Sequence, residues 1–327
     1  MARIPAVLDL EGAREERPAK KQSQSRRLSS EARENLGAYL FLLPWFLGLI
    51  LLTAGPMLSS LYLSFTKFDL LSAPQWIGMQ NYVALFQDPR WLTSVRVTLT
   101  YVFFSVPVKM AMALGLALLL NKGIKGLGLY RAIYYVPSLL GGSVAIAILW
   151  RQVFDADGLV NQALGLIGIH TTQSWISSPG TALFTLVALS AWQFGSPMLI
   201  FMAGLKQIPP EYYEAASTDG AGKVRMFFAV TLPLLTPIIF FNMVLQMIFA
   251  FQAFTPAFIV SGGTGGPDDS TLFYTLYLYQ EGFGYLYMGY ASAMAWILVV
   301  GIAIFTALAF LTSRYWVFYQ DERGDNQ

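Results

Sequence analysis

Six long apolar runs limit how this chain can fold. Each holds about 20 or more predominantly apolar residues, the length that a helix needs to cross the hydrocarbon core of a bilayer. Only 12% of the 327 residues are charged and 55% are hydrophobic, so this apolar surface has to face lipid. The sequence therefore predicts an all-α polytopic membrane protein with six transmembrane helices, at Tyr39–Phe65, Thr98–Leu120, Ala132–Trp150, Thr181–Leu205, Leu234–Val260 and Ala291–Leu311.

The positions of the basic residues predict the orientation. Most of the 21 Lys and Arg precede Tyr39, separate the second and third runs, flank the segment between the fourth and fifth runs, or follow the sixth. Because Lys and Arg collect on the cytoplasmic side, both termini and that segment are predicted to be cytoplasmic. Residues 1–36 are polar and predict a disordered tail, residues 37–318 the membrane domain, and residues 319–327 a short second tail.

The composition also excludes several kinds of chemistry. The chain has no Cys and a single His, which excludes metal sites built on thiolates or on several histidines. Gly222 and Lys223 resemble the end of a phosphate-binding loop, but that motif needs Gly at 217 and a hydroxyl at 224, where Ser217 and Val224 stand. We therefore expect a non-catalytic chain that binds no cofactor, no metal and no nucleic acid.

A charged segment at residues 209–237 interrupts the apolar pattern between the fourth and fifth runs. Pro209 and Pro210 can open a helix, and Glu211 and Glu214 follow near its positive end. Gly220 can take the left-handed conformation that ends such a helix. We expect a short helix on the membrane surface that docks a soluble partner; the alternative is an amphipathic helix that binds only lipid.

The spacing within this segment resembles the EAA loop of bacterial ABC importer permeases. That loop has EAA, three residues, Gly, nine residues, Ile, one residue and Leu-Pro, and Val230 stands here in place of Ile. Further stretches at 77–91, 130–161 and 192–209 resemble carbohydrate permeases of the maltose and glycerol-3-phosphate type. The residues that this resemblance, or the charge pattern, assigns to coupling are Glu211, Glu214, Ala215, Ala216, Asp219, Gly220 and Pro233.

The resemblance, which covers roughly residues 38–318, implies a set of partners. It implies a multi-pass permease in the inner membrane of a prokaryote, paired with a second, homologous permease. It further implies two ATP-binding subunits that hold ATP and Mg, and an extracytoplasmic solute-binding protein. The small side chains of Ala215 and Ala216 would let the ATPase approach closely, while Glu214 offers it a carboxylate.

Polar residues within the runs are candidates for contact with the solute. Asn242, Gln246 and Phe249 fall on one stripe of the fifth run, with Gln252 to one side. Amides can bind sugar hydroxyls and an aromatic face can pack on a sugar ring, but amides can equally hydrogen-bond neighbouring helices. The other candidates lie in the second, fourth and sixth runs: Lys109, Trp192, Gln193 and Tyr290.

The sequence favours an importer of a sugar or oligosaccharide and leaves three alternatives open. Lys109, a cation at membrane depth, would suit an acidic or phosphorylated solute such as a uronic-acid oligosaccharide or glycerol-3-phosphate. A secondary transporter would usually need buried acids or an inverted repeat, and the sequence shows neither. A membrane scaffold without a pathway of its own is the remaining alternative.

Overall fold

The computed structural model describes Asn35 and residues 38–121, 123 and 126–318. The predicted tail at 319–327, and that at 1–36 apart from Asn35, lie outside the described residues. The chain divides into two compact units, Met1–Leu58 and Ser59–Gln327. Within the first unit, the residues from Ala38 onward are helical and include a π-helical stretch, η1, at Leu49–Ala54. This widened turn stands before Pro56, which has no N–H to donate to a regular helical turn.

The second unit opens with a short hairpin before its longest helix. Helix α2 (Gly55–Ser64) leads into β1 (Thr66–Lys67), which pairs antiparallel with β2 (Gln75–Trp76). Helix α3 (Gln80–Gln87) then precedes α4 (Pro89–Leu120). Helix α4 begins sharply because Asp88 caps it, accepting a hydrogen bond from the Arg90 N–H, and Pro89 occupies its first turn.

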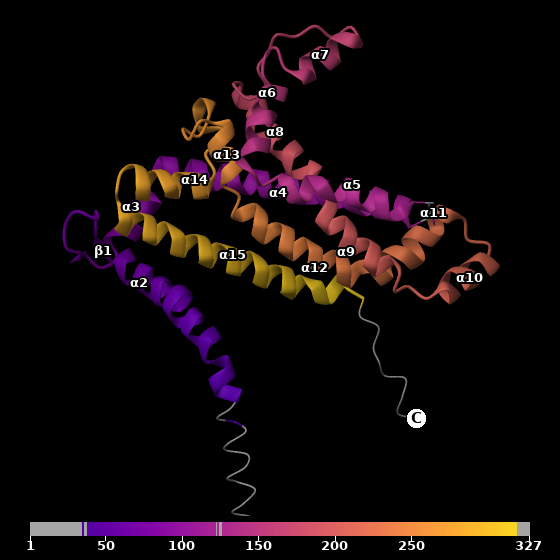
Figure 1. Cartoon of the computed structure of the whole chain (residues 1–327), viewed down its shortest axis with the longest axis horizontal. Coiled ribbons are helices and arrows are strands. Elements are labelled where there is room, and N and C mark those ends of the chain that lie inside the picture. Colours follow the sequence, from indigo (N-terminus) through magenta and orange to yellow (C-terminus); the bar gives the residue numbers. More distant parts are fainter. Residues whose placement is uncertain (1–34, 36–37, 122, 124–125, 319–327) are drawn as a thin grey trace, which may run out of the picture. The chain divides into compact units, whose positions relative to one another are not determined.

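Helix α4 is the centre of the second unit. It packs against α8 (Pro179–Trp192), α9 (Gly195–Leu205) and α12 (Leu232–Phe251), as Figure 1 shows. Fully buried side chains on these helices, among them Leu186 and Phe201, form the core together with residues of α14 and α15. Small residues such as Ala113 and Ala117 let the other helices approach α4 closely.

Two pairs of helices are bent. Helices α5 (Leu127–Leu140) and α6 (Val144–Val153) meet at 96°, and α8 and α9 meet at 44°. The bend between α8 and α9 leaves backbone groups without helical hydrogen-bond partners. Ser138 satisfies two of them, because its hydroxyl donates to the Gln193 carbonyl and accepts from the Ser196 N–H. Gly195 allows this approach, since a Cβ there would lie 2.5 Å from the Tyr134 carbonyl oxygen.

The remaining elements are shorter, except for the last helix. They are α7 (Leu159–Leu166), α10 (Pro210–Thr218), α11 (Lys223–Met226), η2 (Phe227–Thr231), α13 (Thr255–Val260), η3 (Pro267–Asp269), α14 (Tyr274–Tyr279), η4 (Gln280–Gly284) and α15 (Met288–Trp316).

The structure agrees with the prediction of a helical membrane protein and refines its spans. Within the described residues, four helical segments are long and apolar enough to cross a membrane, and six are present if each bent pair counts as one span. The second begins at Pro89, nine residues before the predicted Thr98, because the Asp88 cap and Pro89 start the helix there. Two predictions of one continuous helix are wrong. Gly141 and Gly142 interrupt the helix predicted over Ala132–Trp150, and Ser143 caps a new helix there. The helix predicted over Thr181–Leu205 is divided between Trp192 and Gly195, where α8 ends and α9 begins.

Candidate functional site

The charged segment folds as a short helix followed by a turn. Helix α10 starts at Pro210, directly after Pro209, and carries Glu211 in its first turn. It lies where the sequence predicted it, and the side chains of Glu211, Glu214 and Ala215 are exposed to solvent. Figure 1 shows α10 at one edge of the second unit, next to α11. The predicted helix is therefore present, with its acidic side chains free of ion pairs among the described residues.

Gly220 ends this helix in a left-handed conformation. Its φ is +75°, a value that glycine adopts without steric cost. The Gly220 N–H donates to the Ser217 carbonyl at 3.0 Å and the Ala221 N–H donates to the Ala216 carbonyl at 2.9 Å. These two bonds form a Schellman motif, which satisfies carbonyls that the end of a helix leaves free. Asp219 is the exposed C-cap residue.

A side-chain contact ties α10 to the helix that follows. The Tyr213 hydroxyl lies 3.0 Å from the Thr231 hydroxyl, where η2 leads into α12. Pro233 stands in the first turn of α12, directly after the π-helical stretch η2, whose widened turn accommodates a residue without an N–H. A displacement of α10 would therefore act on the start of α12 through this hydrogen bond as well as through the chain.

Four of the predicted solute-contacting residues line one cavity between helices. This inner cavity has a volume of about 160 Å³, and its lining includes Lys109 from α4, Gln193 from the α8–α9 break, and Gln246 and Phe249 from α12. Tyr101, Ser105 and Ser190 add hydroxyl groups. Residues far apart in the sequence thus present amides, hydroxyls, one aromatic ring and one cation to the same space.

The other predicted solute-contacting residues lie elsewhere. Asn242 is fully buried one turn before Gln246, outside the lining of the inner cavity, and its amide has no hydrogen-bond partner among the described residues. The Trp192 ring packs on Trp150, with their ring centroids 5.9 Å apart. Gln252 is exposed at the end of α12. The structure therefore separates these three residues from the cavity that their neighbours line.

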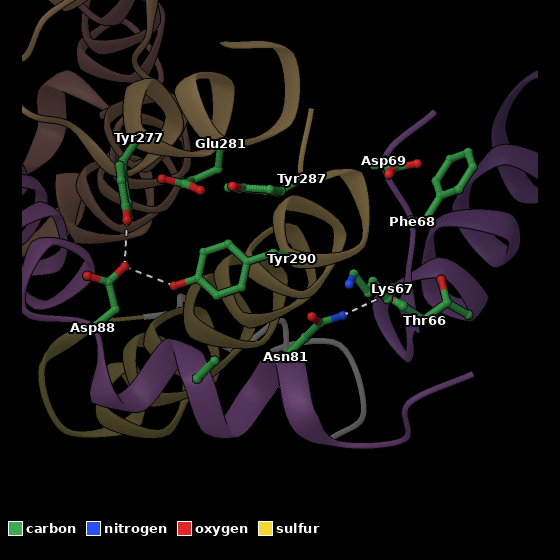
Figure 2. A pocket seen from close by; sticks show the side chains of 11 residues that line it. Thr66, Lys67, Phe68, Asp69, Asn81, Asp88, Tyr277, Glu281, Tyr287 and Tyr290 are labelled. Atoms are coloured by element: carbon green, nitrogen blue, oxygen red, sulfur yellow. Dashed lines mark hydrogen bonds between the residues drawn. The ribbon is translucent and has the colours of Figure 1, made fainter. Parts of the chain in front are cut away.

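Tyr290 belongs to a second, larger cavity that the sequence did not predict. This outer cavity has a volume of about 500 Å³, and Asp88 and Glu281 also line it. The Asp88 carboxylate accepts hydrogen bonds from the hydroxyls of Tyr277 at 2.5 Å and Tyr290 at 2.9 Å, as Figure 2 shows. Asp88 and the tyrosines that contact it lie some 190 positions apart, so only the tertiary fold brings them together. The one local indication of this site was the spacing of Tyr277 and Glu281, which are four residues apart and so share one face of a helix.

The pKa values of the two carboxyl groups of the outer cavity are shifted in opposite directions. Burial by itself raises the pKa of Asp88, but the hydrogen bonds from Tyr277, Tyr290 and the Arg90 N–H outweigh it and hold this pKa below its ordinary value. Burial raises the pKa of Glu281, and the negative charge of Asp88 acts in the same direction. The fold thus favours the ionised form of Asp88 and the neutral form of Glu281.

Glu281→Gln is expected to raise the apparent unfolding temperature at pH 8 and to leave it nearly unchanged at pH 4. Because folding raises the pKa of Glu281, the carboxyl costs stability once the pH exceeds its ordinary value, and a neutral amide avoids that cost. Thermal unfolding in detergent at both pH values measures the effect. The exposed Glu214→Gln change serves as the control, and an equal or lower unfolding temperature at pH 8 would contradict the prediction.

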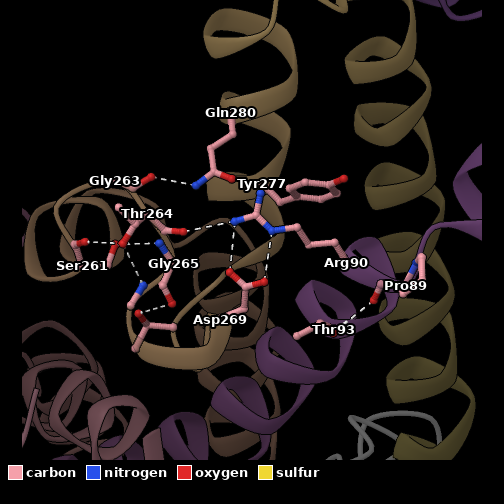
Figure 3. A network of polar contacts seen from close by, with 12 residues as sticks. Pro89, Arg90, Thr93, Ser261, Gly263, Thr264, Gly265, Asp269, Tyr277 and Gln280 are labelled. Atoms are coloured by element: carbon pink, nitrogen blue, oxygen red, sulfur yellow. Dashed lines mark hydrogen bonds and ion pairs between the residues drawn. The ribbon is translucent and has the colours of Figure 1, made fainter. Parts of the chain in front are cut away.

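An ion pair closes the loop beside the outer cavity. The Arg90 guanidinium donates from two nitrogens to the two carboxylate oxygens of Asp269, each at 3.0 Å, and also to the Thr264 carbonyl at 3.2 Å (Figure 3). It lies 5.4 Å from the centroid of the Tyr277 ring. This two-pronged contact fixes the 261–270 loop against the start of α4.

Comparison with known proteins identifies the class to which this fold belongs. Residues 77–317 match the family described as binding-protein-dependent transport system inner membrane component. The chain is 51% identical over 291 residues to a probable ABC transporter permease protein, YesP, of Bacillus subtilis (strain 168), with coverage of 89% of this chain and 94% of that protein. It is 31% identical over 275 residues to the arabinooligosaccharides transport system permease protein AraP of the same organism, with coverage of 83% and 86%.

A solved structure shares the fold. A chain of a bacterial alginate ABC transporter, in complex with an alginate pentasaccharide-bound periplasmic protein, matches with a TM-score of 0.75 at 22% identity. The match covers 88% of this chain and 97% of the other. The chain therefore belongs to the family of binding-protein-dependent transport system inner membrane components. This confirms the predicted resemblance to ABC importer permeases.

Proposed function

We propose that this chain is the permease subunit of an ATP-driven importer of a sugar or oligosaccharide and that it forms half of the translocation pathway. The observation that carries the proposal is the exposed helix α10, ended by Gly220, in a chain of this family. Its surface offers the Glu214 carboxylate beside the small side chain of Ala215. These features suit close docking of a separate ATPase, which would hold ATP and Mg.

The proposed topology has six spans. Each bent helix pair counts as one span, and both termini and α10 face the cytoplasm of a prokaryotic cell. The inner cavity then lies between the spans of this chain, and a second, homologous permease would complete the translocation pathway. An extracytoplasmic solute-binding protein would deliver the solute to the opposite side, and the exposed apolar side chains of the outer helix faces would contact lipid.

In this proposal, α10 transmits the closure of the ATPases to the membrane helices. A displacement of α10 reaches α12 through the Tyr213–Thr231 contact, and α12 carries Gln246 and Phe249 of the inner cavity. Rocking of the two permeases would exchange outward for inward access. Whether the outward-facing or the inward-facing state predominates depends on how much more tightly the ATPase and the solute each bind one state than the other.

The inner cavity supports a sugar as the transported solute. Its amides and hydroxyls can exchange hydrogen bonds with sugar hydroxyls, and Phe249 can pack on the apolar face of a ring. AraP is by its name a permease for arabinooligosaccharides, and a second structural relative is a bacterial ABC transporter involved in the import of the acidic polysaccharide alginate. The names of these relatives support the proposal that this chain also transports a sugar.

Glu214→Lys is expected to lower the amount of ATPase that co-purifies with the chain at least tenfold, about 1.4 kcal/mol in binding free energy. Reversal of an exposed charge within a docking surface places like charges together and removes one hydrogen-bond acceptor. The measurement is quantification of the ATPase that is retained with the tagged chain in detergent, after expression in a host that contains the whole transporter.

Asp157→Lys is the matched control, because it makes the same charge change at an exposed site in the loop between α6 and α7. This loop is predicted to face the other side of the membrane. The control variant should retain the wild-type amount of ATPase. A wild-type chain that retains no ATPase, or a Glu214→Lys chain that retains as much as wild type, would contradict the coupling role.

A further inference from the structure

Lys109 is a cation within the inner cavity without a carboxylate beside it. The residue lies near the middle of α4, and its side chain is half-buried. Among the residues that the structure describes, the one ion pair joins Arg90 and Asp269. An ammonium group held away from bulk water is costly unless a negative charge compensates it. Lys109 therefore leaves a positive charge in the cavity that the described part of the chain does not neutralise.

The rest of the cavity lining is uncharged. Tyr101, Ser105 and Lys109 recur at intervals of four residues, which places them along one face of α4. Gln193 donates its amide N–H to the Gly141 carbonyl at 3.0 Å, so its position is fixed. Gln246 faces the cavity from α12. Neutral donors and acceptors thus surround a single cation, as recognition of a singly charged, hydroxyl-rich ligand would require.

We propose that Lys109 is the subsite for the carboxylate of an acidic sugar, that is, a uronic acid or an oligosaccharide that contains one. This assignment rests on the proposed importer function and adds the chemical class of its solute. One ammonium matches the single negative charge of a carboxylate, whereas a phosphate monoester carries about −1.5 to −2 charges and calls for further cationic donors. The amides and hydroxyls would bind the hydroxyls of the sugar.

The size of the cavity limits what it holds. Its volume of about 160 Å³ is below the range of roughly 300–1,000 Å³ that is usual for sites of drug-sized ligands. It therefore suits one sugar unit rather than a whole oligosaccharide. The ring of Phe249, which is 62% exposed, remains available to stack on that unit. A monosaccharide is accordingly a sufficient probe.

The test compares how tightly matched acidic and neutral monosaccharides bind to the transporter complex, purified in detergent through this chain. The pairs are galacturonate with galactose, glucuronate with glucose, and mannuronate with mannose, and galactose 1-phosphate supplies the phosphate arm. Binding is followed by intrinsic tryptophan fluorescence, with Kd as the readout. At least one uronate is expected to bind ten or more times more tightly than its neutral counterpart.

Two variants at position 109 decide whether the charge is responsible. Lys109→Met keeps a long, unbranched side chain but removes the charge, and it should weaken uronate binding at least tenfold, with neutral sugars changed less than twofold. Lys109→Arg keeps the charge and should retain most of the uronate affinity. Retained co-purification of the ATPase shows that each variant is folded and assembled.

Three results would overturn the assignment. The first is that no uronate binds more tightly than its neutral counterpart, and the second is that Lys109→Met weakens both members of a pair equally. The third is a Lys109-dependent preference for galactose 1-phosphate over galacturonate. Loss of the ATPase from the wild type would instead contradict the importer proposal, and the sugar titrations on the same purified chain would still decide the role of Lys109.

Discussion

Gly220→Pro is expected to reduce ATPase co-purification to background. Proline fixes φ near −65°, so it cannot adopt the +75° that Gly220 has at the end of α10. It also removes the N–H that donates to the Ser217 carbonyl at 3.0 Å, which breaks one bond of the Schellman motif. Because proline is incompatible with this backbone conformation, the substitution would redirect the chain between α10 and α11 and thereby displace the docking surface.

Gly222→Pro is the control for this change. Gly222 has φ −72°, close to the value that proline prefers, and a side chain there would meet open space. The two sites lie two positions apart, so both variants place proline in the same exposed turn. We expect Gly222→Pro to retain most of the ATPase and Gly220→Pro to lose it. Equal retention by both would show that the left-handed turn at Gly220 has no part in coupling.

Gly289→Ala is expected to lower the apparent unfolding temperature in detergent by several degrees. Gly289 lies in the first turn of α15, and a Cβ there would collide with the Thr66 carbonyl oxygen of β1. Its N–H also donates to the Phe68 carbonyl at 3.1 Å. Overpacking of this kind typically costs about 1–3 kcal/mol, and backbone atoms yield less readily than side chains. Because Thr66 and Phe68 line the outer cavity, that cavity should change shape as well.

Gly301→Ala provides the comparison within the same helix. A Cβ at Gly301 would meet nothing within 4 Å, and alanine is favoured over glycine inside a helix by about 1 kcal/mol. Its unfolding temperature should therefore equal or exceed that of the wild type. Thermal unfolding of the two variants side by side measures the difference. A Gly289→Ala protein as stable as Gly301→Ala would show that β1 moves aside at little cost.

Local signals made the helices and the charged segment predictable. The length of an apolar run sets a minimum for a membrane helix, and proline and glycine act on their own backbone. For this reason Pro210 and Gly220 marked the ends of α10 correctly. The same reasoning missed the 96° break between α5 and α6, because Gly141 and Gly142 lower the hydrophobicity of the run that contains them too little to divide it.

The cavities depended on contacts between distant segments. The periodicity of α12 put Asn242 and Gln246 on one stripe, yet the structure places Gln246 at the inner cavity and buries Asn242 outside its lining. Which part of a stripe meets a cavity depends on how closely the neighbouring helices approach. Asp88 and Tyr290, 202 positions apart, share a hydrogen bond that no local pattern in the sequence indicates.

Local sequence was enough to predict the class of the protein, the presence of its long apolar runs and the position of the helix that ends at Gly220. These properties follow from the hydrophobicity and backbone preferences of neighbouring residues. The folded structure was needed to show that Lys109, Gln193 and Gln246 line one cavity and that Asp88 and Glu281 line another. Packing between helices depends on side-chain shape along whole surfaces, and residue spacing does not encode that shape.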